Sequence, residues 1–410
     1  MRAGQLAVIL SVVVLFVFIG CDRAIVSHMR FHIPKLRTPV NSERFFAQRR
    51  QEVCSSKGAE FRYESWRHIG VPGRKFEISP DIFSSVISDY CAPSDAGEIR
   101  SDRVVAVTAM DEKHFEEAQD LIRSFRTCLP NHMLVLVGMG LPQHVVEKVK
   151  RMCNVRYVQF DFEKYPDYVH FIGEYRFKPL VVHNVLFDKW NVVGFKPDAV
   201  FWIDSSIRFR CRAKDMEKAS GRPSEDTMWQ PASNPEEDFH IRWKKIIGEA
   251  DRAGVAWCYP QDYITYYFVP ESMLEYIPST FSDQKEKMFG SGCILVSRSQ
   301  MALDAVVLWW VTCALDPLCM LDKTAQDELW YTGSPFVSLG KKIHQDCHVD
   351  AAHKKRPTAD AEKLPCSRTD QSSLTLLSIN AYGRRPGIPN LTYVKREPTT
   401  LYPDSAIDMC

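Results

Sequence analysis

The segment from Pro197 to Arg208 has a residue pattern that could bring a carboxylate to a ligand. It reads PDAVFWIDSSIR, and an apolar run, AVFWI, leads directly to Asp204. Apolar runs rich in β-branched and aromatic residues are typical of strands that are buried on both faces of an α/β sheet. Ligands of such sheets bind beyond the carboxyl ends of the strands. Asp204 is therefore predicted to meet a ligand or a metal ion, with closure of a turn after the strand as the alternative.

The residues before Asp204 predict alternating strands and helices. Apolar runs at 103–108, 133–137 and 155–160 are expected to be strands, and apolar residues recur at helical spacing at 115–125 and 142–152. A further helix is expected to begin near Lys178 and Pro179, because proline suits the first helical turn. This order predicts an α/β fold with a Rossmann-type, mainly parallel sheet flanked by helices.

The residues after Asp204 predict one more strand and two helices. The run Cys293–Val296 is expected to be a strand, and the helix after it has an apolar face wide enough to be buried. A second helix is expected to open at Thr369, with Asp370 as a candidate N-cap residue. The proline-rich tail from Arg384 onward is expected to be irregular.

The amino terminus is predicted to anchor the chain in a membrane. Residues 6–21, LAVILSVVVLFVFIGC, carry no charge. The run is short for a spanning helix, but neutral neighbours could lengthen it in a thin internal membrane. The small residues of a signal-peptidase site fit badly at its end, so an uncleaved anchor is favoured over a cleaved signal peptide. We therefore expect a single-pass type II protein of the Golgi or ER membrane, with its C-terminal part in the lumen.

Cysteine usage favours an oxidising compartment. Twelve cysteines follow the anchor, and no pair of them has the C-x-x-C spacing of zinc ribbons or thioredoxin sites. Disulfides in a secretory compartment are therefore predicted, with their connectivity left open. The sequon at Asn390 would accept a glycan in the same compartment.

Composition and charge bound the class of protein. The 410 residues suffice for one large domain or two ordinary ones, and 45% hydrophobic residues indicate a globular chain. Because 52 Lys plus Arg balance 51 Asp plus Glu, a nucleic-acid-binding surface over the whole protein is not expected. We expect four parts: a cytoplasmic tip and anchor at 1–30, a stem and irregular packing segment held by Cys54 and Cys91 at 31–100, an α/β domain at 101–385, and an irregular tail at 386–410.

Four motifs carry a resemblance to known proteins. They are YRFKPLVV at 175–182, FWIDSSIRF at 201–209, WWVTCALDPLC at 309–319 and RTDQSSL at 368–374. Together with the order of the predicted elements, they resemble glycosyltransferases of the GT-A type over residues 103–380. More closely, they resemble a family of animal proteins, expanded in nematodes and other invertebrates, that is assigned to the nucleotide-diphospho-sugar transferases by similarity. The resemblance implies transfer of a hexose from a nucleotide sugar to a hydroxyl of a glycan or glycoprotein.

In GT-A enzymes a D-x-D motif holds a divalent cation that bridges the diphosphate of the donor. Here the motif reads Asp204-Ser205-Ser206, so the second carboxylate is absent, and no histidine follows position 353 where retaining enzymes of this type carry a metal ligand. One option is that Asp204 holds Mn²⁺ or Mg²⁺, with Ser206 or water completing the oxygen shell. The other option is a site without metal in which basic residues bind the diphosphate, namely Arg176, Lys178 and Arg208. The alternative for each of these three residues is an ordinary solvated charge on the surface.

The resemblance also implies roles for other residues. Asp370 and Gln371 would lie near the reacting carbon, with Gln371 facing the anomeric centre. Thr108 and Ala109, at the end of the first strand, would border the nucleotide. Small residues before the late strand would let the backbone approach an acceptor sugar, or would form a tight turn: Gly290, Ser291 and Gly292. The aromatic stretch at 257–268 could stack on sugar rings or pack in the core.

Two other functions remain open from the sequence. The first is a non-catalytic lumenal protein, binding glycans or serving as a scaffold, that derives from a transferase and has lost the second metal carboxylate. The second is a phosphate-handling hydrolase, which is disfavoured because the chain lacks a Gly-rich phosphate loop and a clustered carboxylate pair.

Overall fold

A computed structural model gives the fold of the chain. It describes residues 39–56, 61–67, 70–209, 211, 239–258, 260–320, 352–353, 355–358, 361–364, 368–383 and 392–394. The chain divides into two compact units, Met1–Phe45 and Phe46–Cys410. The first unit contributes only the start of helix α2 (Pro39–Ser56) to the described part. The expected anchor at 6–21 and the sequon at Asn390 lie outside the described residues, and no described helix is long and apolar enough to cross a bilayer.

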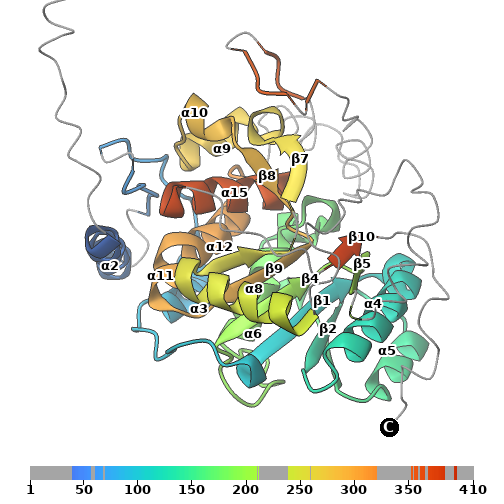
Figure 1. The fold of residues 1–410 in the computed structure, drawn as a ribbon. Helices are drawn as coiled ribbons and strands as arrows, with labels where there is room; N and C mark the ends of the chain where they lie inside the picture. The colour runs from blue at the N-terminus through green and yellow to red at the C-terminus, as the bar shows by residue number, and fades with distance from the viewer. Residues whose placement is uncertain are drawn as a thin grey trace, which may run out of the picture. The chain divides into compact units, whose positions relative to one another are not determined.

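The centre of the second unit is a mixed sheet that has six strands in the described part of the chain (Figure 1). Its order is β3 (Val155–Gln159), β2 (Leu134–Gly138), β1 (Val104–Met110), β4 (Ala199–Ile203), β9 (Cys293–Ser297) and β6 (Val255–Trp257). The first four strands are parallel, whereas β9 runs antiparallel to both β4 and β6. The expected α/β fold with a mostly parallel sheet is confirmed. Since β4 ends at Ile203, Asp204 leaves the sheet at the carboxyl end of a central strand.

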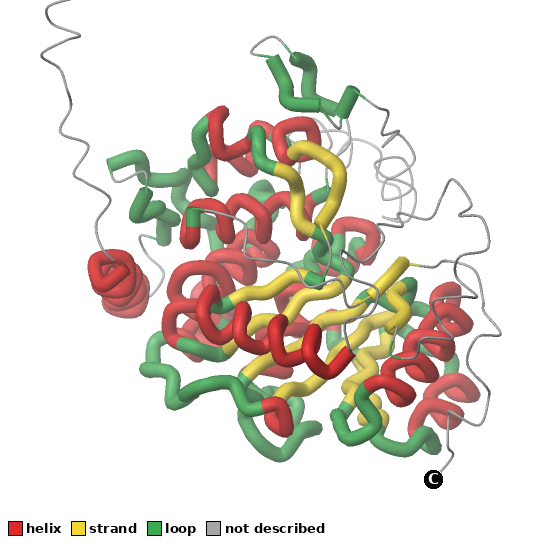
Figure 2. The backbone as a smooth tube through the Cα atoms, in the orientation of Figure 1, coloured by secondary structure: helices red, strands yellow, loops and turns green. Residues whose placement is uncertain are grey.

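Helices cover both faces of this sheet (Figure 2). The helices α4 (Phe115–Cys128), α5 (Gln143–Lys150) and α8 (Phe239–Ala253) share one hydrophobic core with strand residues such as Phe201 and Ile203. Side chains alternate between faces along a strand, so Trp202 points to the other side. There α6 (Phe177–Leu186) contacts β1 and β4, and the ring of Phe177 lies 6.2 Å from that of Trp202.

Two further helices extend the second face and carry part of the site. Helix α12 (Leu308–Leu315) packs against α6, and α15 (Thr369–Tyr382) packs against α12. The buried apolar face expected for the helix after β9 is confirmed, because every residue of α12 is buried. The helix expected to open at Thr369 is α15, and most of its residues are buried as well. The shorter described elements are α3 (Pro80–Ser85), α9 (Glu271–Tyr276), α10 (Phe281–Gln284), α11 (Gln300–Ala302) and the paired strands β7 (Pro260–Ile264) and β8 (Lys287–Phe289).

Two segments are more regular than expected. Helix α2 has 18 residues, although the segment before residue 100 was expected to be irregular. Phe46 and Val53 lie two helical turns apart in α2 and are both buried. This spacing indicates a helix with one buried face, but the charged residues between them make the apolar pattern hard to recognise in the sequence. In the tail, β10 (Thr392–Val394) pairs antiparallel with β5 (Ile207–Phe209). Local composition does not reveal that pairing, because the partner strand lies far away in the sequence.

Disulfides join described segments, in agreement with the expected oxidised cysteines. Cys54 is bonded to Cys91, which confirms that this pair holds the segment before the sheet. The other bridges that are described are Cys128–Cys211, Cys258–Cys293 and Cys313–Cys319.

A buried carboxylate lies in the π-helical turn Leu303–Val307 that joins α11 to α12. The side chain of Asp304 is 3% exposed, and its Oδ2 lies 3.2 Å from Nη1 of Arg50 in α2. Burial raises the pKa of Asp304 to about 6, although the charge of Arg50 opposes the shift. The folded chain therefore holds a proton at this carboxyl more tightly than the unfolded chain does.

This raised pKa predicts a pH dependence of stability. Protonated Asp304 contributes as much as about 3 kcal/mol to the free energy of unfolding. This contribution is fully present below about pH 4 and is lost as the pH rises through about 6. The variant Asp304→Asn lacks this titration, so its stability relative to the wild type is expected to rise over the same interval. Urea unfolding of both proteins across this range measures the difference. Parallel pH profiles would contradict the prediction.

Candidate active site

The carboxylate of Asp204 is fixed at the end of β4. Its backbone N–H donates to the carbonyl of Gly292 at 2.7 Å, which ties the strand end to the turn before β9. The indole Nε1 of Trp202 donates to Oδ1 of Asp204, also at 2.7 Å. The side chain remains 33% exposed, so this carboxylate is oriented by the sheet and still reaches solvent.

Lys178 lies in the first turn of α6 and points to Asp204. Its side chain is 2% exposed, and Nζ lies 3.3 Å from Oδ1 of Asp204 and 2.7 Å from Oδ2 of Asp370. The same nitrogen donates to the carbonyl of Ser291 at 3.4 Å. Four elements far apart in the sequence therefore meet at one ammonium group.

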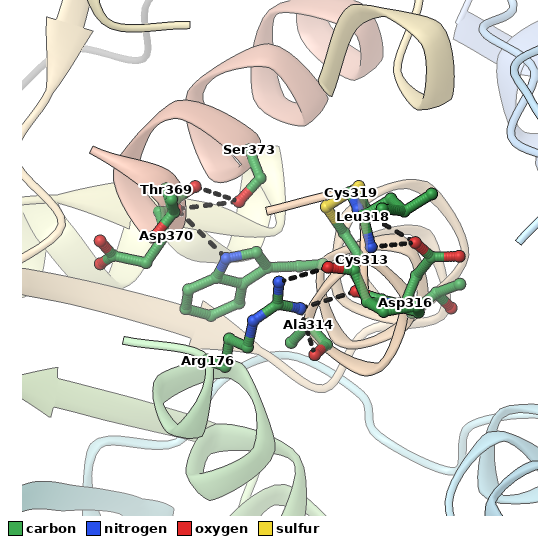
Figure 3. Close-up of a disulfide and its surroundings, with 12 residues drawn as sticks. Arg176, Cys313, Ala314, Asp316, Leu318, Cys319, Thr369, Asp370 and Ser373 are labelled. Carbon is green, nitrogen blue, oxygen red and sulfur yellow. Dashed lines mark hydrogen bonds between the residues drawn. A yellow bond between two sulfur atoms is a disulfide. The ribbon is translucent and has the colours of Figure 1, made fainter. Parts of the chain in front are cut away.

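Asp370 enters this cluster from the first turn of α15. Arg368 is the N-cap residue of the helix, so the alternative that Asp370 caps the helix is wrong. The backbone carbonyl of Asp370 accepts from Nε1 of Trp310 at 3.2 Å and from Oγ of Ser373 at 3.1 Å (Figure 3). The bond to Trp310 fixes the start of α15 against α12. Gln371 is 4% exposed, and its Nε2 has no hydrogen-bond partner among the described residues.

The electrostatics of the cluster favour a charged Lys178. Burial lowers the pKa of Lys178, but the carboxylates of Asp204 and Asp370 more than offset it, so the pKa lies above its ordinary value. The aromatic rings of Tyr175 and Trp202 add to this, since their centroids lie 5.1 and 5.3 Å from Nζ. Tyr175 itself adopts a left-handed backbone conformation with φ of 56°, which an L-residue adopts at a cost of about 1–3 kcal/mol.

Arg368 is a functional candidate that sequence reasoning missed. Its guanidinium lies over the rings of Tyr263 and Phe268, at 5.2 and 5.6 Å from their centroids. Burial raises the pKa of Tyr175, the charges of Asp204 and Asp370 raise it further, and those of Lys178 and Arg368 lower it. Arg368 therefore shares the electrostatic environment of the cluster. Its position next to Asp370 in the RTDQSSL motif was the available signal.

The structure does not place Arg176 in the cluster. This side chain is fully buried and its Nε lies 2.5 Å from Oε2 of Glu174. Its Nη1 donates to the carbonyls of Ala314 and Asp316, and its Nη2 donates to that of Pro317 (Figure 3). Arg176 therefore binds the C-terminal end of α12 and the loop closed by the disulfide Cys313–Cys319.

Arg208 is also fully buried. Its Nη1 donates to the carbonyls of Ser205 and Ile207 at 2.6 and 2.7 Å, and Nη2 lies 3.8 Å from Oδ2 of Asp120. The hydrogen bonds to Ser205 and Ile207 stabilise the turn after β4. The alternative that Arg208 is a solvated surface charge is wrong, because the side chain is fully buried.

Of the remaining predicted site residues, some contact the cluster around Lys178 and others have no described contact with it. Thr108 and Ala109 lie inside β1, which continues to Met110, so they do not end the strand as expected. Thr108 is fully buried, and Ala109 and Ser206 are half-buried. The segment Gly290, Ser291 and Gly292 does reach the cluster, through the carbonyls that face Lys178 and Asp204.

The aromatic stretch at 257–268 packs largely in the core. The ring of Trp257 is fully buried and stacks on Phe289, with centroids 4.5 Å apart. Tyr267 and Phe268 belong to a hydrophobic cluster with Met288. The packing alternative therefore describes these side chains.

The described residues do not fit a divalent cation at this site. The Oδ1 atom of Asp204 already accepts from Trp202, and the ammonium of Lys178 lies between Asp204 and Asp370, where a bridging cation would have to bind. Across the described part of the chain, no group of three or more His, Cys, Asp or Glu side chains could hold a metal ion.

Comparison with known families gives one match. Residues 54–183 match a family model described as "Protein of unknown function (DUF1647)". The matched segment includes β1 and Lys178 but ends before Asp204 and Asp370. No sequence among curated proteins matches the chain.

Several solved glycosyltransferase structures match in part. The galactosyltransferase LgtC, solved with donor and acceptor sugar analogues, is 10% identical over 50% of this chain, with a TM-score of 0.26. Core-mannan synthase A from Aspergillus fumigatus, in an Mn/GDP form, is 9% identical over 51% of the chain, with a TM-score of 0.23. Mouse xyloside xylosyltransferase 1 is 9% identical over 70% of the chain and 84% of its own length, with a TM-score of 0.28. The chain spans 63% of LgtC and 62% of the mannan synthase.

Proposed function

We propose that this chain is a glycosyltransferase that moves a hexose from a nucleotide sugar to a hydroxyl of a glycan or glycoprotein. The observation that carries the proposal is the meeting of Asp204, Lys178 and Asp370 beyond the carboxyl end of β4. These residues come from the motifs that carry the resemblance to GT-A enzymes, and open α/β sheets bind ligands at this edge. The helices and the strand that carry these residues do not need the cluster in order to form, so its presence favours a functional role.

The proposed reaction is a substitution at the anomeric carbon of the donor. The acceptor oxygen forms the new bond, the bond to the diphosphate oxygen breaks with its electron pair, and the hydroxyl proton is released. Asp204 is the most exposed carboxylate of the cluster and would orient the sugar or the acceptor hydroxyl. Asp370 and Gln371 would border the reacting carbon, and Arg368 would offset charge on the leaving diphosphate.

The proposal includes a location. Residues 6–21 would anchor the chain in the Golgi or ER membrane with the α/β domain in the lumen, and a glycan on Asn390 would be acquired there. The disulfides that the structure describes support an oxidising compartment.

Hydrolysis of a sugar nucleotide tests the activity. The purified full chain is expected to release nucleoside diphosphate slowly from at least one member of a panel of UDP- and GDP-sugars. The variants Asp204→Asn and Asp370→Asn are each expected to lower that rate by about 100-fold or more, because each removes a charge placed for the transition state. The matched control is Asp161→Asn, a surface carboxylate whose described ion pair is with Lys164, three residues along the chain.

The control variant is expected to retain the wild-type rate. No release from any donor, with or without Mn²⁺, together with no nucleotide binding would instead favour the non-catalytic lumenal protein. Wild-type rates in both Asp204→Asn and Asp370→Asn would contradict the assignment of the site.

A further inference from the structure

The ammonium of Lys178 lies among oxygen atoms of three other segments. An ammonium group has three N–H donors and no acceptor. Nζ lies 2.7 Å from the carboxylate of Asp370 and 3.3 Å from that of Asp204, and it donates to the carbonyl and the hydroxyl of Ser291 at 3.4 and 3.5 Å. A single positive charge therefore joins α15, the end of β4 and the turn before β9.

These are the connections that a bound divalent cation makes in a site built from oxygen ligands. Mg²⁺ and Mn²⁺ bridge carboxylates and carbonyls, and Mg²⁺ usually keeps several water ligands. Here the bridging position is occupied by a covalently attached cation whose side chain is 2% exposed. The ring centroids of Tyr175 and Trp202 lie 5.1 and 5.3 Å from the ammonium, which suits a cation without a hydration shell.

We infer that Lys178 takes the place of the divalent cation in this chain, and that the site binds a sugar nucleotide without a metal. This inference rests on the proposed function and adds which group supplies the positive charge in its site. It also explains the missing second carboxylate of the Asp204-Ser205-Ser206 motif. A second carboxylate in the motif would add a third negative charge beside one lysine, whereas Ser206 adds none.

Nucleotide binding with and without metal is the first test. Calorimetric titration of UDP and of GDP into the full chain is expected to give the same Kd in EDTA and in MnCl₂, within about two-fold. Binding that is about ten-fold or more tighter in MnCl₂, with the gain lost in Asp204→Asn, would overturn the inference and leave the proposed function intact. Absence of binding by either nucleotide in both buffers would overturn the proposed function.

Removal of the ammonium is the second test, and it does not depend on nucleotide binding. Titration of MnCl₂ alone, followed by the electron paramagnetic resonance signal of free Mn²⁺, is expected to show no specific site in the wild type. The variant Lys178→Met leaves two facing carboxylates and is expected to gain one Mn²⁺ site, which the added change Asp370→Asn removes. The matched control is Lys164→Met, an exposed lysine paired with Asp161, which is expected to gain none.

A wild-type chain that binds Mn²⁺ through Asp204 would contradict the inference, as would a folded Lys178→Met variant that gains no site. Circular dichroism establishes whether the variant is folded. If it is not, the wild-type nucleotide titrations decide the question.

Discussion

Replacement of Lys178 by methionine is expected to lower the free energy of unfolding by about 3–5 kcal/mol, because it leaves buried negative charge without its partner. The side chain of Asp370 is 6% exposed and its described ion pair is with Lys178. Methionine keeps most of the volume of the lysine stem, so the loss reports the charge rather than a cavity. Urea unfolding measures the change.

A double variant separates charge from packing. Adding Asp370→Asn to Lys178→Met removes one uncompensated carboxylate, and it is expected to recover a large part of the lost stability. The surface variant Lys164→Met is expected to change stability by no more than about 1 kcal/mol, as exposed pairs contribute little. Equal losses in the single and the double variant would show that the ion pair does not stabilise the fold.

Replacement of Arg176 by methionine is expected to have a loss of similar size, about 3–5 kcal/mol, for a different reason. Burial already raises the pKa of Glu174, and the charge of Arg176 opposes that shift. The variant leaves this carboxylate buried without a cation. It also leaves the carbonyls of Ala314, Asp316 and Pro317 without a donor, at the end of the helix that holds Asp370 through Trp310.

Two further variants test this explanation. Arg176→Lys is expected to recover little, because an ammonium lacks the planar fork that reaches three carbonyls and a carboxylate together. Glu174→Gln in the Arg176→Met background is expected to recover the part that comes from the unpaired charge. The control is Arg100→Met, an exposed arginine paired with Asp102, which is expected to be close to neutral. A loss no larger than that of the control would contradict the role assigned to Arg176.

The two basic residues of the YRFKP motif show where sequence reasoning reaches its limit. Arg176 and Lys178 are equally plausible phosphate ligands in the sequence, yet one is committed to the end of α12 and the other to Asp204 and Asp370. The side-chain direction depends on the left-handed turn at Tyr175 and on the residue at which α6 begins. Neither is visible in composition or periodicity, because neither feature follows from a repeating pattern of residue types.

Local residue patterns were enough to predict the strand that ends before Asp204, the alternation that makes most of the sheet parallel, and the apolar helices that cover it. Those features follow from the period of apolar residues, which is local. Only the tertiary structure decided that Asp204, Asp370 and Ser291 share one lysine, that β9 runs antiparallel beside β4, and that the tail adds β10. These contacts join residues far apart in the chain, and their geometry depends on how whole elements pack, which no local pattern records.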